Sequence, residues 1–91
     1  MEKKLFFVFN PKAGKGKIKT ALMDIVDVFN KGGYEVVIRA TQYPKDAYEM
    51  TRKYADKVDL VVCSGGDGTL DEVVAGLVET GSKMDDVIYE E

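Results

Sequence analysis

A glycine-rich loop between an apolar run and an amphipathic helix is the feature that most constrains this chain. Residues 60–63 read LVVC, which is typical of a buried strand, and the loop SGGDGT occupies residues 64–69. Apolar side chains then recur from Leu70 to Val78 with helical spacing. Glycines let the backbone turn tightly and approach a ligand closely, and the N-terminus of a following helix attracts anions. The segment therefore predicts a strand–loop–helix unit that binds phosphate.

Asp67 stands inside this loop, where a carboxylate would repel a phosphate unless a cation lay between them. Mg²⁺ bound by one carboxylate and by phosphate oxygens removes that conflict, so the loop is typical of a metal–nucleotide site with Asp67 as the metal ligand. Thr69 and Glu72 have the spacing of a capping box, which predicts that Thr69 caps a helix beginning at Leu70. The alternative is that the glycines only form a tight turn between a strand and a helix.

A second loop follows the same plan earlier in the chain. Residues 5–9 form the apolar run LFFVF, and residues 10–17 form the loop NPKAGKGK before another amphipathic helix. The loop is not a phosphate-binding Walker A motif, because Lys17 is followed by Ile18 and not by a hydroxyl residue. It also lacks the third glycine of a dinucleotide fingerprint, since Lys19 stands in that position. Its three lysines suit a phosphate, although each could also be an ordinary solvated side chain.

Together the two loops resemble the diacylglycerol kinase catalytic domain family, which includes bacterial lipid kinases, sphingosine kinases and ceramide kinases. That family pairs N-P-x-(S/A)-G with S-G-G-D-G-T-x-N-E-V, and residues 10–14 and 64–73 match these motifs. The resemblance extends from about residue 4 to residue 83. One position departs from the pattern, because Asp71 replaces the usual asparagine and adds negative charge beside Asp67. The G-G-D-G core also occurs in NAD kinases, so an NAD kinase-like phosphotransferase fragment is an alternative.

The resemblance implies an ATP-dependent kinase that transfers the γ-phosphoryl group of ATP to a lipid hydroxyl, with ATP and Mg²⁺ as cofactors. It implies that Asp67 is the catalytic and metal-binding residue. Thr41, at the end of the second predicted strand, matches a weaker family element and is expected to face the nucleotide. The residues expected to bind the cofactor are Asn10, Pro11, Lys12, Ala13, Gly14, Thr41, Gly65, Gly66, Asp67, Gly68, Thr69, Leu70, Asp71 and Glu72.

Apolar runs and helical patterns alternate along the chain. Strands are predicted at residues 4–9, 35–40 and 59–63, and helices at 18–31, 45–55 and 70–79. This alternation predicts an α/β fold, a three-layer βαβαβα open parallel sheet resembling the Rossmann-like N-terminal lobe of diacylglycerol kinase and NAD kinase-type proteins. Right-handed crossovers place the carboxyl ends of the strands at one edge, which brings Asn10, Thr41 and Ser64 together.

With 91 residues, the chain is much shorter than a whole lipid kinase. We expect residues 1–83 to be a truncated catalytic, ATP-binding domain. Residues 84–91 do not match the family and are expected to be an acidic tail, arising as a truncation end, a frameshifted end or an expression artefact; a native disordered tail is the alternative. In the family, a second domain supplies the lipid pocket and the general base, so this chain alone is expected to be inactive. A non-catalytic nucleotide-binding or interaction module is the alternative.

Composition adds a few expectations about partners. The net charge of −3 disfavours a nucleic-acid partner, while lysines near the N-terminus suit a nucleotide or peripheral contact with an anionic membrane. The chain has no histidine, and its single cysteine, Cys63, lies in an apolar strand and is expected to be buried. No segment has membrane-spanning length, so a cytoplasmic location is expected. An unpaired edge strand would favour a homo-oligomer, and the lipid substrate depends on the missing domain.

Overall fold

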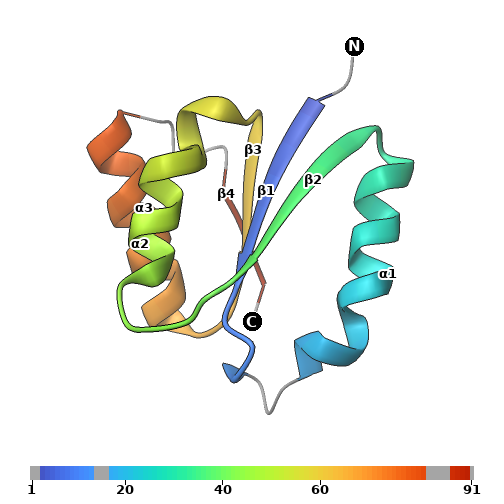
Figure 1. The fold of residues 1–91 in the computed structure, drawn as a ribbon, viewed down its shortest axis with the longest axis horizontal. Helices are drawn as coiled ribbons and strands as arrows, with labels where there is room; N and C mark the ends of the chain where they lie inside the picture. The colour runs from blue at the N-terminus through green and yellow to red at the C-terminus, as the bar shows by residue number, and fades with distance from the viewer. Residues whose placement is uncertain (1–2, 14–16, 82–86, 91) are drawn as a thin grey trace.

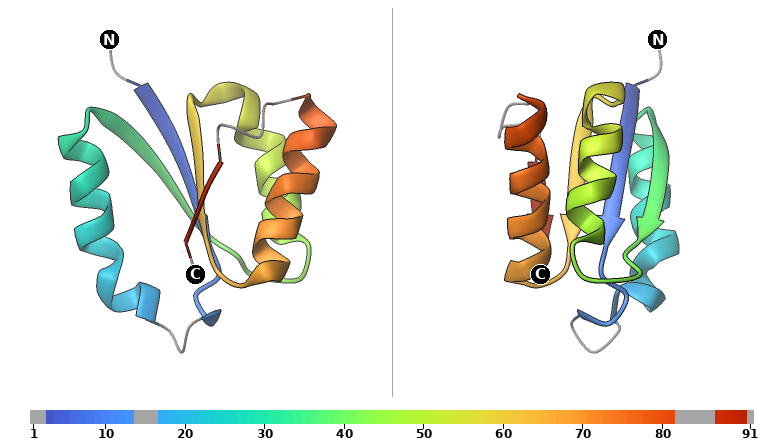
Figure 2. Two further views of the ribbon diagram at one scale, coloured as in Figure 1. Left: turned by 180° about the vertical axis from the view of Figure 1, so that it is seen from behind. Right: turned by 60° about the vertical axis from the view of Figure 1, so that its left-hand side comes forward.

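The computed structural model of the protein describes residues 3–13, 17–81 and 87–90. Parallel strands form one sheet in the order β2-β1-β3-β4. Helix α1 covers one face of the sheet, and helices α2 and α3 cover the other (Figures 1 and 2). This arrangement confirms the predicted three-layer α/β fold with an open parallel sheet.

Most elements begin and end close to the predicted residues. Their bounds are β1 Lys3–Phe9, α1 Lys17–Lys31, β2 Tyr34–Ala40, α2 Asp46–Tyr54, the 3-10 helix η2 Ala55–Lys57, β3 Leu60–Ser64, α3 Asp67–Thr80 and β4 Val87–Glu90. Three elements differ from the prediction: α3 begins at Asp67 and not at Leu70, and neither η2 nor β4 was predicted. No helix within the described residues is long and apolar enough to cross a membrane.

Residues 87–90, which we expected to belong to an acidic tail, form strand β4. It pairs in parallel with β3, with Val87 opposite Val61 and Glu90 opposite Ser64. Its sequence VIYE is rich in residues that favour strands, and without it β3 would form an open edge of the sheet. The sequence interpretation gave more weight to the acidic residues of this segment than to its strand propensity, and it therefore missed the strand.

The central strand β1 explains why residues 5–9 are apolar without interruption. Its neighbours are β2 and β3, and helices cover both of its faces, so every side chain from Leu5 to Phe9 is buried. Phe6 and Val8 pack with the residues under α2 and α3, whereas the alternate side chains of β1 pack toward α1. Cys63 belongs to the α2–α3 side, where burial raises the pKa of its thiol to about 11. The thiol is therefore buried and protonated at neutral pH, as expected.

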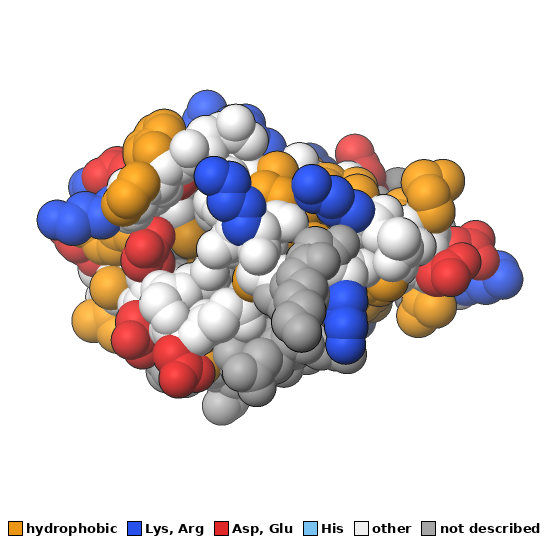
Figure 3. All heavy atoms as spheres, turned by 90° about the horizontal axis from the view of Figure 1, so that it is seen from below, with side chains coloured by type: hydrophobic (Ala, Val, Ile, Leu, Met, Phe, Trp, Pro, Cys, Tyr) orange, Lys and Arg blue, Asp and Glu red, His pale blue; other side chains and the backbone are white. Residues whose placement is uncertain are grey.

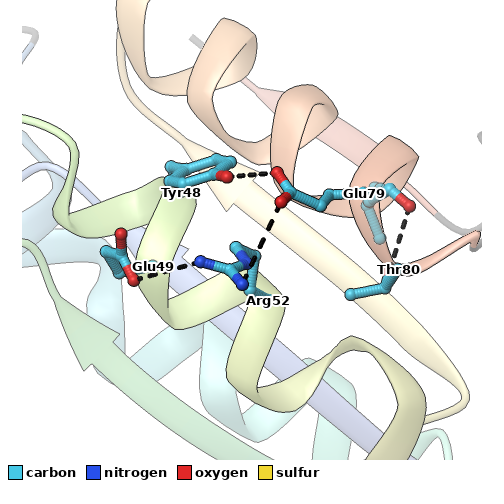
Figure 4. A network of polar contacts seen from close by, with 6 residues as sticks. Tyr48, Glu49, Arg52, Glu79 and Thr80 are labelled. Carbon is cyan, nitrogen blue, oxygen red and sulfur yellow. Dashed lines mark hydrogen bonds and ion pairs between the residues drawn. The ribbon is translucent and has the colours of Figure 1, made fainter.

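Helices α2 and α3 lie directly against each other. Gly76 makes this approach feasible, because a Cβ atom at that position would lie 2.8 Å from the Cβ of Thr51 and 2.9 Å from the carbonyl oxygen of Tyr48. At the surface, the Tyr48 hydroxyl donates a hydrogen bond to Glu79, and Arg52 lies 4.0 Å from the same carboxylate (Figure 4). Close packing and polar contacts thus join the two helices that stand beside the candidate site.

Candidate functional site

The loops that follow β1, β2 and β3 meet at one edge of the sheet. Beyond the end of β1, the Asn10 N–H donates to the carbonyl oxygen of Ser64 at 3.0 Å. On the other side, the Thr41 N–H donates to the carbonyl oxygen of Phe9 at 2.9 Å. These two bonds continue the sheet past its last regular residues, so they hold the three loops together. The carboxyl edge of an open parallel sheet is where such folds bind their ligands.

The first loop turns sharply because Asn10 bonds to its own neighbours. Its side-chain Oδ1 accepts a hydrogen bond from the Lys12 N–H at 2.9 Å, and its carbonyl oxygen accepts one from the Ala13 N–H at 3.2 Å. Pro11 stands between these residues and restricts the backbone further. The asparagine side chain therefore has a structural task in shaping the loop, a role that asparagine commonly fills in turns. Gly14 was expected to contribute to this site but lies outside the described residues.

The third loop is shorter than predicted, because α3 begins at Asp67. The carbonyl oxygen of Gly66 accepts the first helical hydrogen bond, from the Leu70 N–H at 3.2 Å, and no side chain caps the helix. The N–H groups of Asp67 and Gly68 precede this bond and so lie at the positively polarised end of the helix. A helix that begins here offers an anion its first N–H groups directly at the sheet edge.

The predicted capping box of Thr69 and Glu72 is wrong. Because α3 begins before Thr69, its hydroxyl is already inside the first turn and cannot act as the N-cap. The Thr69 side chain is buried and packs against Gly65 instead, where a Cβ atom would lie 2.6 Å from Thr69 Oγ1. Gly65 is therefore required by the close approach of Thr69. This contact fixes the path of the chain from β3 into α3.

A pocket of about 400 Å³ lies between these loops on the α2–α3 side of the sheet edge. Its volume is within the range of roughly 300–1,000 Å³ that is typical of small-molecule sites. The predicted site residues that line it are Asn10, Pro11, Lys12, Thr41, Gly68, Thr69 and Glu72. Figure 3 looks onto this edge of the molecule, where Lys or Arg side chains lie near the middle of the face.

Sequence reasoning missed part of this pocket. Gln42, Tyr43 and Pro44 also line it, and none of them belongs to either glycine loop. The available signal was their position directly after Thr41, since a loop at the carboxyl end of a parallel strand contributes to the ligand crevice. The second loop therefore contributes a larger part of the wall than the single threonine we had predicted.

Other predicted residues lie outside this pocket. Ala13 and Gly65 line a separate cavity of about 130 Å³ under α1, and Leu70 packs against the apolar core. Gly66, Asp67 and Asp71 do not line the pocket, and the two carboxylate side chains are exposed. The structure thus divides the predicted set into residues of the pocket wall and residues that shape or flank it.

The acidic groups near the pocket define what kind of metal site could form. Within the described residues, no three His, Cys, Asp or Glu side chains are grouped to hold a metal ion. Asp67 is an exposed carboxylate in the first turn of α3, where the helix dipole favours negative charge. A divalent cation at Asp67 would therefore take most of its other oxygen ligands from a bound phosphate or from water, which is the usual mode for Mg²⁺.

Asp46 has a structural role beside the pocket. Its carboxylate is 4% exposed and accepts a hydrogen bond from the Gln42 N–H at 2.8 Å. Its negative charge, together with a side-chain hydrogen bond, raises the pKa of the neighbouring Tyr43 hydroxyl above its usual value. Lys45 reaches the start of α2 through a left-handed backbone conformation, with φ of 72°. Asp46, the first residue of α2, therefore fixes the conformation of the loop that follows β2.

Comparison with known proteins identifies the family. The sequence model of the "Diacylglycerol kinase catalytic domain" matches residues 4–87. The chain therefore belongs to the diacylglycerol kinase catalytic domain family. The resemblance inferred from the two glycine loops is confirmed, and the match extends into the first residue of β4.

Individual relatives agree with this assignment. The chain is 40% identical over 80 residues to a diacylglycerol kinase of Staphylococcus epidermidis and 39% identical to one of Staphylococcus aureus; each alignment covers 87% of this chain and 25% of the relative. A crystal structure of a diacylglycerol kinase from Bacillus anthracis aligns with a TM-score of 0.71 and 33% identity, covering 85% of this chain and 28% of that one. This chain thus spans about a quarter of the length of the curated relatives it matches.

Proposed function

We propose that this chain is the ATP-binding lobe of a lipid kinase that transfers the γ-phosphoryl group of ATP to the hydroxyl of a diacylglycerol-like lipid. The observation that carries the proposal is the pocket of about 400 Å³ where the three loops of a diacylglycerol kinase family fold meet. The pocket adjoins a helix N-terminus and contains a lysine, two features that suit an anionic ligand.

In this proposal the chain's own residues bind and orient the phosphates. The N–H groups at the start of α3, which include that of Gly68, donate to phosphate oxygens, and Lys12 contributes positive charge from the opposite loop. Thr41 faces the nucleotide from the end of β2, and Asp67 holds Mg²⁺ against the phosphates. When bound, Mg²⁺ neutralises the charge that develops on the transferred phosphoryl group.

We further propose that this chain alone does not phosphorylate lipid. Phosphoryl transfer needs an acceptor held in line with the phosphate, a group that orients its hydroxyl, and exclusion of water. The pocket is lined by residues of three loops at the sheet edge, and the chain spans about a quarter of the length of its relatives. In the family pattern the lipid pocket and the general base belong to a second domain, so the chain is expected to bind nucleotide without transferring phosphate.

The test uses the whole chain and a chimera in which it replaces the matching segment of the Staphylococcus epidermidis diacylglycerol kinase. The chain alone should bind Mg-ATP, measured by amide chemical shifts, without phosphorylating diacylglycerol micelles. The chimera should phosphorylate diacylglycerol, and Asp67→Ala should abolish that activity together with the Mg²⁺ dependence of ATP binding. Asp56→Ala removes a similarly exposed carboxylate from η2, outside the pocket, and is the matched control.

Three kinds of outcome would contradict the proposal. Equal Mg²⁺ dependence in the parent and in Asp67→Ala would remove Asp67 from the metal site. Failure of the chain to bind ATP, or an inactive chimera that is correctly folded, would refute the assignment of the pocket to a nucleotide. Asp67-dependent lipid phosphorylation by the 91-residue chain would instead show that the lobe is sufficient for catalysis.

A further inference from the structure

Tyr43 has a large aromatic side chain, lines the candidate pocket and belongs to neither glycine loop. It lines the pocket, yet its side chain is 61% exposed. An aromatic side chain presents a flat apolar face, and when it stands at a pocket wall that face is available to a flat ligand group. The role of Tyr43 therefore depends on which part of a ligand reaches this ring.

The loop that carries Tyr43 is held in place by short local hydrogen bonds. Besides the bond from Gln42 N–H to Asp46, the Gln42 side-chain Nε2 donates to the carbonyl oxygen of Ala40 at 3.0 Å. The Asp46 N–H in turn donates to the carbonyl oxygen of Tyr43 itself at 3.1 Å. Pro44 restricts the backbone immediately after the tyrosine. Because the loop is already ordered, a ligand that contacts Tyr43 loses little free energy to ordering it.

The charges around the pocket differ from one part of its wall to another. Gly68 lies at the N-terminus of α3, where N–H groups favour phosphate, and Lys12 also lines the pocket. Glu72 lines the pocket further along α3, about 6 Å from Gly68 at the helical rise per residue. Its carboxylate would repel a phosphate there. The part of a ligand that extends beyond the helix N-terminus is therefore expected to be uncharged.

We propose that Tyr43 is the platform on which the base of the bound nucleotide stacks. This inference rests on the proposed function, since it assumes that the phosphates occupy the start of α3. The nucleobase is the flat, uncharged part of a nucleotide, and it matches the exposed ring in shape and polarity. Stacking requires only a π-face, so Tyr43 contributes to affinity more than to the choice of base.

The experiment compares two probes on the whole chain, Mg-ATP and Mg-tripolyphosphate, with dissociation constants from amide chemical-shift titrations. Tyr43→Ala should weaken ATP binding by about five- to 150-fold, the range for loss of one base–aromatic stack. It should leave tripolyphosphate binding within about twofold of the parent, because that probe has no base. Tyr43→Phe keeps the ring and should bind both probes like the parent. The amide spectra of the free variants show whether each is folded.

Each remaining outcome would overturn the inference. If Tyr43→Ala weakens neither probe, or weakens both equally, the ring does not hold the base. If Tyr43→Phe loses as much affinity as Tyr43→Ala, the hydroxyl and not the ring is responsible. If the parent binds tripolyphosphate as tightly as ATP, the base makes no contact, although the proposed phosphate site would stand. If the parent binds neither probe, the proposed function fails and this inference fails with it.

Discussion

The two faces of the sheet are packed to different degrees. On the α2–α3 face, Val73 and Leu77 of α3 have no exposed surface, and Gly76 lets α3 lie against α2. On the opposite face, α1 has no fully buried residue, and a cavity of about 130 Å³ remains beneath it. The difference indicates that the α2–α3 face supplies more of the stability. The candidate pocket lies on this better packed side, so its wall is fixed by the tighter half of the fold.

A matched pair of leucines gives the largest expected effect. Leu77→Ala on α3 deletes a completely buried side chain and should lower the free energy of unfolding by about 2–5 kcal/mol. Leu22→Ala on α1 deletes a partly buried side chain and should cost about 1 kcal/mol, because less apolar surface returns to water. Urea denaturation monitored by circular dichroism measures the free energy of unfolding of the two variants and of the parent.

The comparison of the two faces would fail if the two leucine variants lost the same stability. If Leu77→Ala is unfolded while Leu22→Ala is folded, the result would support the difference between the two faces. The slope of the urea transition must stay similar in both variants, because a changed slope would mean that the mutation altered the compactness of one state.

Two glycines of α3 test whether the close approach of the helices matters. Gly76→Ala should destabilise the fold by about 1–3 kcal/mol, because the new methyl group would meet the Thr51 side chain and the Tyr48 backbone. Gly68→Ala is the matched control, since a Cβ atom there meets nothing within 4 Å and alanine favours a helix over glycine. Thermal unfolding should place the Gly76 variant below the parent and the Gly68 variant at or above it. The reverse order would mean that α2 and α3 can separate at little cost.

The strands and helices could largely be predicted from sequence because each carries a regular apolar pattern. The apolar run at residues 5–9 predicted a strand, and β1 lies inside the sheet between β2 and β3 with every side chain from Leu5 to Phe9 buried. The pattern of residues 18–31 predicted an amphipathic helix, but not that the side chains facing the sheet, such as Leu22 and Phe29, would be only partly buried. Depth of burial depends on what else covers the face, which periodicity along one helix does not encode. Strand β4 was missed because residues 84–91 were interpreted as an acidic tail outside the family match.

The loops of the candidate site were predicted from sequence, but several residues that line its pocket were not. The glycine loops and Thr41 were predicted to meet at one edge of the sheet, and the structure brings them together there, since parallel strands place their carboxyl ends side by side. Thr69 was misread as a cap because the T-x-x-E spacing fits a capping box equally well when the helix begins earlier. Tyr43 was missed because its significance depends on the fold of the second loop around Asp46, a contact between residues that carry no recognisable motif.

The smallest expected effect concerns the hydrogen bond that the Tyr48 hydroxyl of α2 donates to Glu79 of α3. The bond to Glu79 raises the pKa of Tyr48 above its usual value near 10. Because the folded pKa exceeds the unfolded one, this contribution to stability is fully present below pH 10 or so and is lost as the pH rises through the folded pKa.

Glu79→Gln should return the pKa of Tyr48 toward its usual range. The NMR signals of the Tyr48 ring, recorded as a function of pH, measure this change. The ring of Tyr43 is the internal control, because its raised pKa comes from Asp46 and should not change. If the pKa values of both tyrosines change equally, or neither changes, the Tyr48–Glu79 contact does not determine the pKa of Tyr48. The difference between the two faces would then rest on apolar packing alone.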